Sequence, residues 1–139
     1  MTRFTDTYLL YLLAQASSRA SAGFHARLAA MGIAVSTWRI LATLYPDAPA
    51  GISELAASCL TKQPTMTRQI DRLVKAELVS RHMIRDDRRR VEIRLTEQGC
   101  GLAARLTAMA RAHEATILAG LAPAAIAQLK QVLADLGDT

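Results

Sequence analysis

Residues 52–96 decide the fold, and they read ISELAASCLTKQPTMTRQIDRLVKAELVSRHMIRDDRRRVEIRLT. Their first part predicts a short helix with Ser53 as its N-cap, followed by a second helix that opens at Gln63 with Pro64 at position N1. After Glu77, apolar and polar residues alternate in two runs on either side of a charged hairpin tip, which predicts two short strands. Two helices followed by a two-stranded hairpin are the element order of a winged helix-turn-helix.

Long amphipathic helices flank this segment on both sides. Apolar residues recur at three- and four-residue steps, which predicts helices from Asp6 to Met31, from Ser36 as N-cap to just before Pro46, from Glu97 to Ala119 with Thr96 as N-cap, and from Pro123 to Leu136, with a turn over 45–51. The apolar stripes of the outer helices need a partner, and a second copy of the chain is the simplest one.

The expected fold class is therefore mainly α with a small two-stranded β-wing. We expect a single domain over 1–139, with a winged helix-turn-helix lobe over 36–96 and long N- and C-terminal dimerisation helices over 6–34 and 97–137.

The positive charge of the chain is concentrated in the central segment. The 139 residues carry a net charge of +5, and residues 61–100 hold ten basic and six acidic side chains, which accounts for +4 of it. A basic helix face beside a basic hairpin is the electrostatic signature of a protein that binds the nucleic acid backbone. An even spread of charge would have indicated little more than solubility.

The polar face of the helix that opens at Gln63 carries side chains suited to DNA. Gln63 can read adenine and Arg68 can read guanine through paired hydrogen bonds, while Thr65 and Thr67 can donate to phosphates or contact thymine methyl groups. The predicted hairpin is slim enough for the minor groove, and its arginines are Arg88, Arg89 and Arg90. The alternative is a solvated charged face, or a winged helix used as a protein–protein interaction module without specific DNA binding.

Other classes of function have little support in the sequence. Half of the residues are apolar (51%), which excludes a disordered chain, and no apolar run approaches the ~20 residues of a membrane span. No nucleophile motif, phosphate loop or metal-ligand spacing is present, so we expect neither an enzyme nor a cofactor or metal site. Two cysteines form no disulfide framework, and a cytoplasmic location is expected.

Three segments together resemble the MarR family of transcription regulators: 52–56, 63–73, and Asp87-Arg88-Arg89 with the run 93–99. The resemblance implies a homodimer that binds double-stranded DNA at a pseudo-palindromic operator. It also implies that Arg89 enters the minor groove, that Asp87 holds Arg89 through a salt bridge, and that Arg72 and Arg68 touch backbone or bases. Two departures are Glu77, where the family often has glycine and where we expect a differently shaped turn, and Ala122, a weak helix cap.

The same resemblance implies a cleft in which many members bind aromatic acids and are released from DNA. The residues expected to line it are Tyr11, Ser18, Arg19, Trp38 and Arg39. An arginine beside aromatic rings can bind a carboxylated ring, although tyrosine and tryptophan at helical spacing are more often core residues. A cysteine redox sensor is a further alternative; Cys59 lies in a small apolar helix that predicts burial, and Cys100 lies near a helix start.

Overall fold

The computed structural model describes residues 1–84 and 87–138, except for the side chains of residues 87–89. The described elements are a short 3₁₀ turn η1 (Phe4–Asp6), α1 (Leu9–Ala30), α2 (Val35–Leu44), β1 (Ala50–Gly51), α3 (Ile52–Ser58), α4 (Gln63–Lys75), β2 (Val79–Ile84), β3 (Asp87–Leu95), α5 (Glu97–Ile117) and α6 (Pro123–Gly137). The fold is mainly helical with one small sheet, as the sequence predicts.

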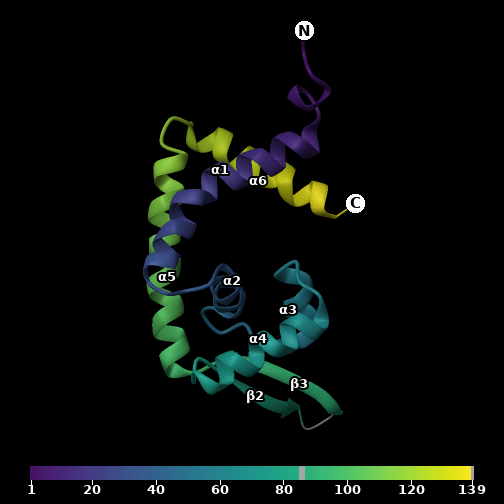
Figure 1. Ribbon diagram of the computed structural model, residues 1–139, viewed down its shortest axis with the longest axis vertical. Coiled ribbons are helices and arrows are strands. Elements are labelled where there is room, and N and C mark those ends of the chain that lie inside the picture. Colours follow the sequence, from purple (N-terminus) through teal and green to yellow (C-terminus); the bar gives the residue numbers. More distant parts are fainter. Residues whose placement is uncertain (85–86, 139) are drawn as a thin grey trace.

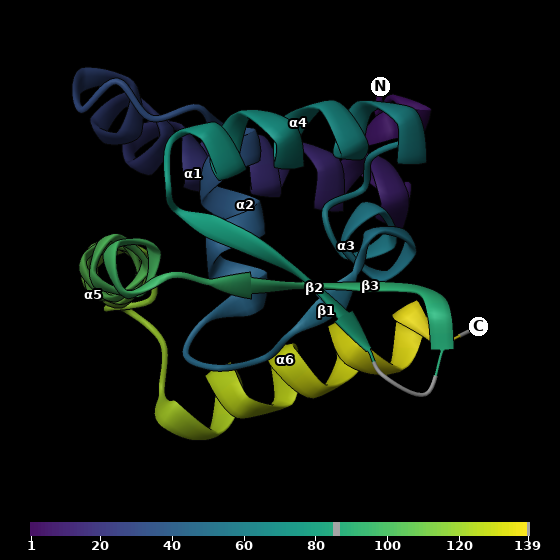
Figure 2. The ribbon, with the colours of Figure 1, turned by 90° about the horizontal axis from the view of Figure 1, so that it is seen from below.

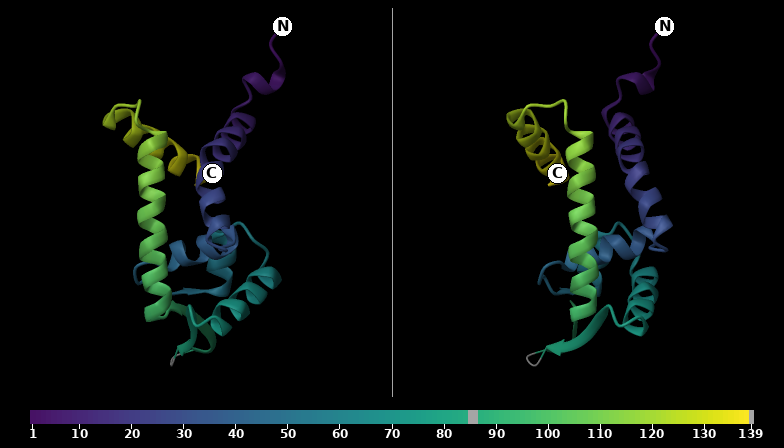
Figure 3. Two further views of the ribbon diagram at one scale, coloured as in Figure 1. Left: turned by 60° about the vertical axis from the view of Figure 1, so that its left-hand side comes forward. Right: turned by 90° about the vertical axis from the view of Figure 1, so that its left-hand side faces the viewer.

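Helix α5 connects two regions of the molecule (Figure 1). At its N-terminal end it meets the sheet, and α2, α3 and α4 pack there. At its C-terminal end the chain turns back into α6, and the first part of α1 lies in the same region. Figure 3 shows α1 and α6 on different sides of this end of α5.

The hydrophobic core lies in the region around α2, where helices and sheet meet. Its most deeply buried large side chains are Leu28, Ile40, Leu41, Leu44, Leu55, Met66, Ile70, Val79, Ile93 and Leu106. They come from α1 to α5 and from both long strands, so burial of this one apolar cluster fixes α4 and the wing relative to α2 and α5. Helix α6 contributes no buried residue.

The sheet has three antiparallel strands in the order β1-β3-β2, one more than the sequence predicts. β1 consists of Ala50 and Gly51, which pair with Ile93 and Glu92 of β3. The predicted turn over 45–51 therefore ends in a strand. A two-residue strand has no alternation to detect, and its partner lies more than forty residues along the chain. Figure 2 shows β1, the hairpin and α4 from below.

Two of the predicted helix caps are wrong and one is confirmed. The N-cap of α2 is Ala34 rather than Ser36, and that of α3 is Gly51 rather than Ser53. For α3, Glu54 at position N3 reaches back to the cap, and its Oε1 accepts a hydrogen bond from Gly51 N (3.4 Å). Thr96 caps α5 as predicted, because its hydroxyl oxygen accepts from Gly99 N at 3.0 Å.

The turn after α4 adopts the left-handed conformation in spite of its glutamate. We expected another shape, but Glu77 has φ 61°. Glu77 N donates to Val74 O and Leu78 N donates to Leu73 O, both at 3.0 Å, which is the Schellman pattern that glycine usually completes. The closing hydrogen bonds and the burial around the turn outweigh the steric cost of the side chain at positive φ.

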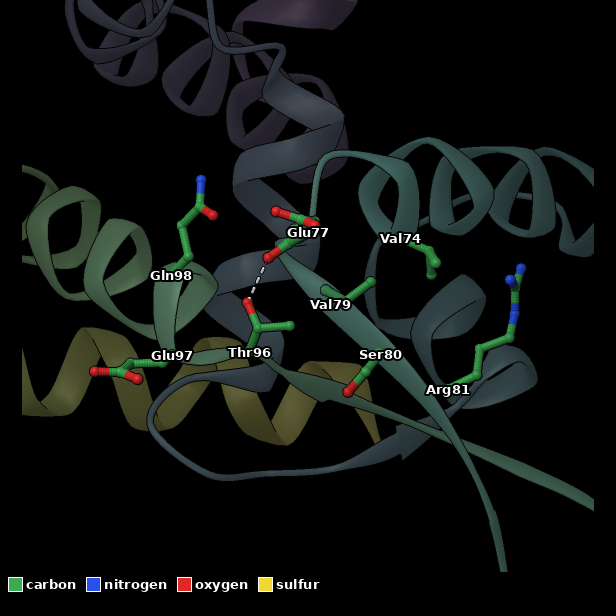
Figure 4. A pocket seen from close by; sticks show the side chains of 8 residues that line it. All are labelled: Val74, Glu77, Val79, Ser80, Arg81, Thr96, Glu97 and Gln98. Atoms are coloured by element: carbon green, nitrogen blue, oxygen red, sulfur yellow. Dashed lines mark hydrogen bonds between the residues drawn. The ribbon is translucent and has the colours of Figure 1, made fainter.

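The start of α5 is locked against this turn. Thr96 Oγ1 donates to Glu77 O at 2.6 Å, the bond drawn in Figure 4 beside an open hollow of about 920 Å³. A Cβ atom on Gly99 would lie only 1.9 Å from Leu78 O, so the backbones of α5 and the turn approach as closely as glycine allows. The position of the wing therefore follows the position of α5.

Candidate nucleic-acid interface

Helix α4 presents a polar face away from the core. Its opposite face is apolar, with Met66, Ile70 and Leu73 buried. The residues of α4 predicted to contact DNA lie on this polar face. Gln63, Thr67, Arg68 and Arg72 are exposed, and Thr65 is half-buried. The exposed residues are displayed on a rigid helix, which is the arrangement needed for groove recognition.

Local hydrogen bonds already restrain three of these side chains. Thr67 Oγ1 donates to Gln63 O at 3.1 Å, as a threonine in a helix interior commonly does. This bond uses the only hydroxyl hydrogen of Thr67, so Thr67 presents its methyl group and an acceptor rather than the donor that the sequence suggested. Arg68 Nη2 lies 3.4 Å from Thr65 Oγ1, and its guanidinium keeps further N–H groups for a partner.

The first turn of α4 leaves backbone N–H groups without a side-chain cap. Lys62 is the N-cap, and no side chain there accepts a hydrogen bond from the first turn. A helix start with unused N–H groups and a lysine at its cap attracts anions. A backbone phosphate is one anion that this end of α4 can accept.

An ion pair joins the wing to α3. Arg90 Nη2 lies 3.2 Å from Glu54 Oε1, and both side chains are well exposed. Such a pair is weak in water, on the order of 0.2–1 kcal/mol, so Arg90 can exchange Glu54 for a phosphate at little cost. The side chains of Asp87, Arg88 and Arg89, and with them the predicted Asp87–Arg89 salt bridge, lie outside the described residues.

Sequence reasoning missed the contacts that connect these elements. Arg81 of β2 forms an ion pair with Asp71 of α4, which ties the wing to α4. Gln63 Nε2 donates to Ser53 Oγ at 3.0 Å, which ties α4 to α3. Both bonds join residues ten positions apart on different elements, so no helical or strand periodicity could indicate them.

The residues predicted to bind an effector lie on α1 and α2 and differ in exposure. Tyr11, Ser18 and Arg19 are exposed on α1 and Arg39 is exposed on α2, whereas Trp38 is half-buried and packs edge-on against Phe24 with ring centroids 5.1 Å apart. A cavity of about 460 Å³ lies instead between α1, α5 and α6, and none of the five residues lines it. His113, whose Nε2 lies 2.6 Å from Ala20 O, and the Lys130–Glu114 pair are at its wall.

The two cysteines differ in exposure. Cys59 is buried as predicted, and burial raises the pKa of its thiol, which opposes formation of the reactive thiolate. Cys100 is half-buried with its Sγ 3.9 Å from Pro46 O. Within the described part of the chain, no group of three or more metal-ligating side chains is found, and no helix is long and apolar enough to cross a membrane.

The comparison with known proteins identifies the family. The family model described as MarR family matches residues 33–91, which include α2 to α4 and most of the wing. The chain is 43% identical to a MarR family transcriptional regulator from Silicibacter pomeroyi DSS-3, over 99% of this chain and 98% of that one, with a TM-score of 0.87. The chain belongs to the MarR family.

Other solved structures have the same fold as this MarR-family protein. NadR in complex with 4-hydroxyphenylacetate is 27% identical over 98% of this chain and 96% of NadR, with a TM-score of 0.87. BpsR of Bordetella bronchiseptica, whose DNA binding is regulated by 6-hydroxynicotinic acid, is 22% identical over 100% of this chain and 99% of BpsR, with a TM-score of 0.82. The likeness to BpsR establishes the fold alone.

Proposed function

We propose that this MarR-family protein is a homodimeric, cytoplasmic DNA-binding repressor that is released by a small ligand. The observation that carries the proposal is the exposed polar and basic face of α4 beside a basic wing. Four of the five net charges of the chain lie in residues 61–100, around these two elements. Membership of a family of transcriptional regulators supports the same conclusion, and we propose no catalytic role.

In this proposal, the two elements contact two grooves of one duplex. α4 lies in the major groove, where Gln63 and Arg68 face base edges and Arg72 faces the backbone. The wing lies over the adjacent minor groove, with Arg89 inserted and Arg88 and Arg90 on the flanking phosphates. Replacing one phosphate-binding arginine by alanine should lower the salt slope of binding by about one.

The dimer is proposed from the outer helices, 6–34 and 97–137. α6 buries no residue, and the exposed apolar side chains around it and on α1 include Leu9 (51% exposed), Leu10 (60%), Leu129 (44%) and Val132 (47%). A 15-residue helix is marginal in water without tertiary packing, so α6 needs a surface to cover it. A second copy supplies a matching apolar surface, and it places two α4 helices for the two halves of a palindromic operator.

A small aromatic acid is the proposed effector. NadR binds 4-hydroxyphenylacetate and shares the fold at 27% identity. In this chain, the half-buried Trp38 with Arg39 beside it in sequence offers an aromatic surface and a cation for such an acid, and Tyr11, Ser18 and Arg19 complete the proposed site. A ligand that favours one spacing of the two α4 helices shifts DNA affinity by about 5–150-fold, which corresponds to a coupling of ~1–3 kcal/mol.

DNA binding is tested by footprinting the purified protein on the DNA that flanks its own gene, followed by a salt titration at the protected site. We expect a protected pseudo-palindrome and a steep salt dependence. Arg68→Ala and Arg89→Ala should weaken binding, whereas Arg105→Ala, an exposed arginine on α5, should not. Weak binding without sequence preference would instead favour the protein–protein interaction module.

The dimer and the effector site have separate tests. Leu129→Asp should shift the sedimentation coefficient toward the monomer at micromolar concentration, and Gln131→Asp, which adds the same charge at a polar position of α6, should not. Trp38 is the only tryptophan of the chain, so its fluorescence reports directly on the proposed site. Quenching by 4-hydroxyphenylacetate that Arg39→Ala weakens and Arg105→Ala preserves would support the effector site.

A further inference from the structure

The first residue of α4 is held by a side chain from α3. Gln63 Nε2 donates to Ser53 Oγ at 3.0 Å. Both residues are exposed, and they line a hollow of about 490 Å³ whose other walls include Glu54 and Arg90. The hollow thus lies where the start of the recognition helix meets the base of the wing, on the side of the molecule that carries the proposed DNA contacts.

The chemistry of the glutamine amide makes this bond informative. A primary amide has one carbonyl oxygen and two N–H groups. Reading adenine in the major groove uses the oxygen, which accepts from N6, and one N–H, which donates to N7. One N–H is left over, and a single hydroxyl acceptor is sufficient to satisfy it. Ser53 can therefore hold the amide without competing with an adenine.

Ser53 is itself well anchored. The residues that follow in α3 include Leu55 and Ala56, which are buried in the core. Its neighbour Glu54 accepts from Gly51 N at 3.4 Å, so the start of α3 is tied to β1. The hydroxyl of Ser53 consequently has a fixed position relative to α4, to which Gln63 can be tied.

Restraint of Gln63 before binding has a direct effect on recognition. A glutamine side chain on a surface has several rotatable bonds, and fixing them on binding costs affinity. A side chain that is already held in a reading position avoids part of that cost, but only when the matching base is present. The effect therefore appears as discrimination between bases and not as general affinity for DNA.

We propose that Ser53 is a positioning residue for sequence recognition, which holds the Gln63 amide so that its free edge reads an adenine in each operator half-site. This inference rests on the proposed DNA-binding function. Ser53 acts through Gln63 and contacts no base itself. Base reading by Gln63 of α4 thus depends on Ser53 of the preceding helix, α3.

The test is a selection from a pool of duplexes with a randomised 20-base-pair segment, carried out with the full-length wild-type protein. Affinities are then measured for single-base variants of the selected site. We expect one A·T pair in each half-site whose replacement by G·C lowers wild-type affinity roughly tenfold. Ser53→Ala should reduce this discrimination about three- to tenfold while the salt slope stays unchanged.

Four further variants separate positioning from a structural role. Ser53→Thr keeps the hydroxyl and should retain the discrimination, and Ser58→Ala, an exposed serine at the other end of α3, should leave it unchanged. The double variant Ser53→Ala/Gln63→Ala should discriminate no worse than Gln63→Ala alone, because Ser53 acts only through Gln63. Thermal unfolding of each variant checks that the fold is intact.

Three outcomes would overturn the inference while leaving the proposed function standing. The first is full discrimination at every position by Ser53→Ala, and the second is a loss that adds to that of Gln63→Ala. A uniform loss of affinity across all duplexes would also overturn it, because that is the signature of a structural role. If the wild-type protein enriches no sequence, the proposed function fails together with the inference.

Discussion

The glutamate in the left-handed turn after α4 is the most direct opportunity to stabilise the protein. A non-glycine residue in this conformation costs about 1–2 kcal/mol. The hydrogen bonds that the structure gives Glu77 use only its backbone: N donates to Val74 O, and O accepts from Thr96 Oγ1. Glu77→Gly therefore removes the steric cost and keeps the contacts that hold the turn.

The gain is reduced by the greater freedom of glycine in the unfolded chain, which costs roughly 0.5–1 kcal/mol. We expect a net stabilisation of about 0.5–1 kcal/mol, which corresponds to a rise of roughly 2–4 °C in the midpoint of thermal unfolding. Unfolding is followed by circular dichroism at one fixed protein concentration, because the proposed dimer would make the midpoint depend on concentration.

Glu77→Ala is the matched control for this substitution. It removes the same carboxylate but keeps a Cβ atom in the left-handed conformation. If Glu77→Gly is no more stable than Glu77→Ala, the side chain at positive φ carries no measurable cost, and the reasoning about the turn is refuted.

Three other predictions concern packing, thiol reactivity and DNA binding. Gly99→Ala should destabilise the protein by several kcal/mol or change the wing geometry, because its Cβ would lie 1.9 Å from Leu78 O; an unchanged urea midpoint would contradict this. Cys59 in the native protein should react with a thiol reagent much more slowly than Cys100. Burial raises the pKa of the Cys59 thiol, so the reactive thiolate forms only at higher pH. Equal reaction rates of the two cysteines at pH 7 would contradict this prediction. Arg68→Ala should relax base preference at one operator position, which binding to a panel of operator variants measures.

The element order could be predicted because it depends on local periodicity. Apolar residues at helical spacing, the alternation after Glu77 and the cap at Thr96 identify α4, β2, β3 and α5. The exposed face of α4 follows from the same periodicity, since burial of Met66 and Ile70 leaves the opposite face in solvent. Thr65 lies at the edge of that face and is half-buried. The periodicity therefore predicts which face is exposed, but not how exposed each side chain is.

The features that could not be predicted depend on contacts between distant segments. β1 exists because Ala50 meets Ile93 across the sheet, and two residues give no pattern of their own. Serine is a residue type that commonly caps helices, yet the hydroxyl of Ser53 accepts a hydrogen bond from Gln63 on another helix. Sequence rules predict which kinds of group a serine hydroxyl can bond, but the tertiary structure determines which of these groups lies within hydrogen-bonding distance.

The close contact at the start of α5 has a mechanical consequence. With Gly99 already against the carbonyl of Leu78, this junction has no room to slide, and α5 acts as a lever with the wing fixed to its N-terminal end. The 21 residues of α5 span about 30 Å at 1.5 Å per residue. A tilt of about 10° at the α6 end would move the far end by roughly 5 Å, the height of one helical turn. In the proposed DNA complex, such a displacement would exceed the step of about 3.4 Å between successive bases that α4 would match.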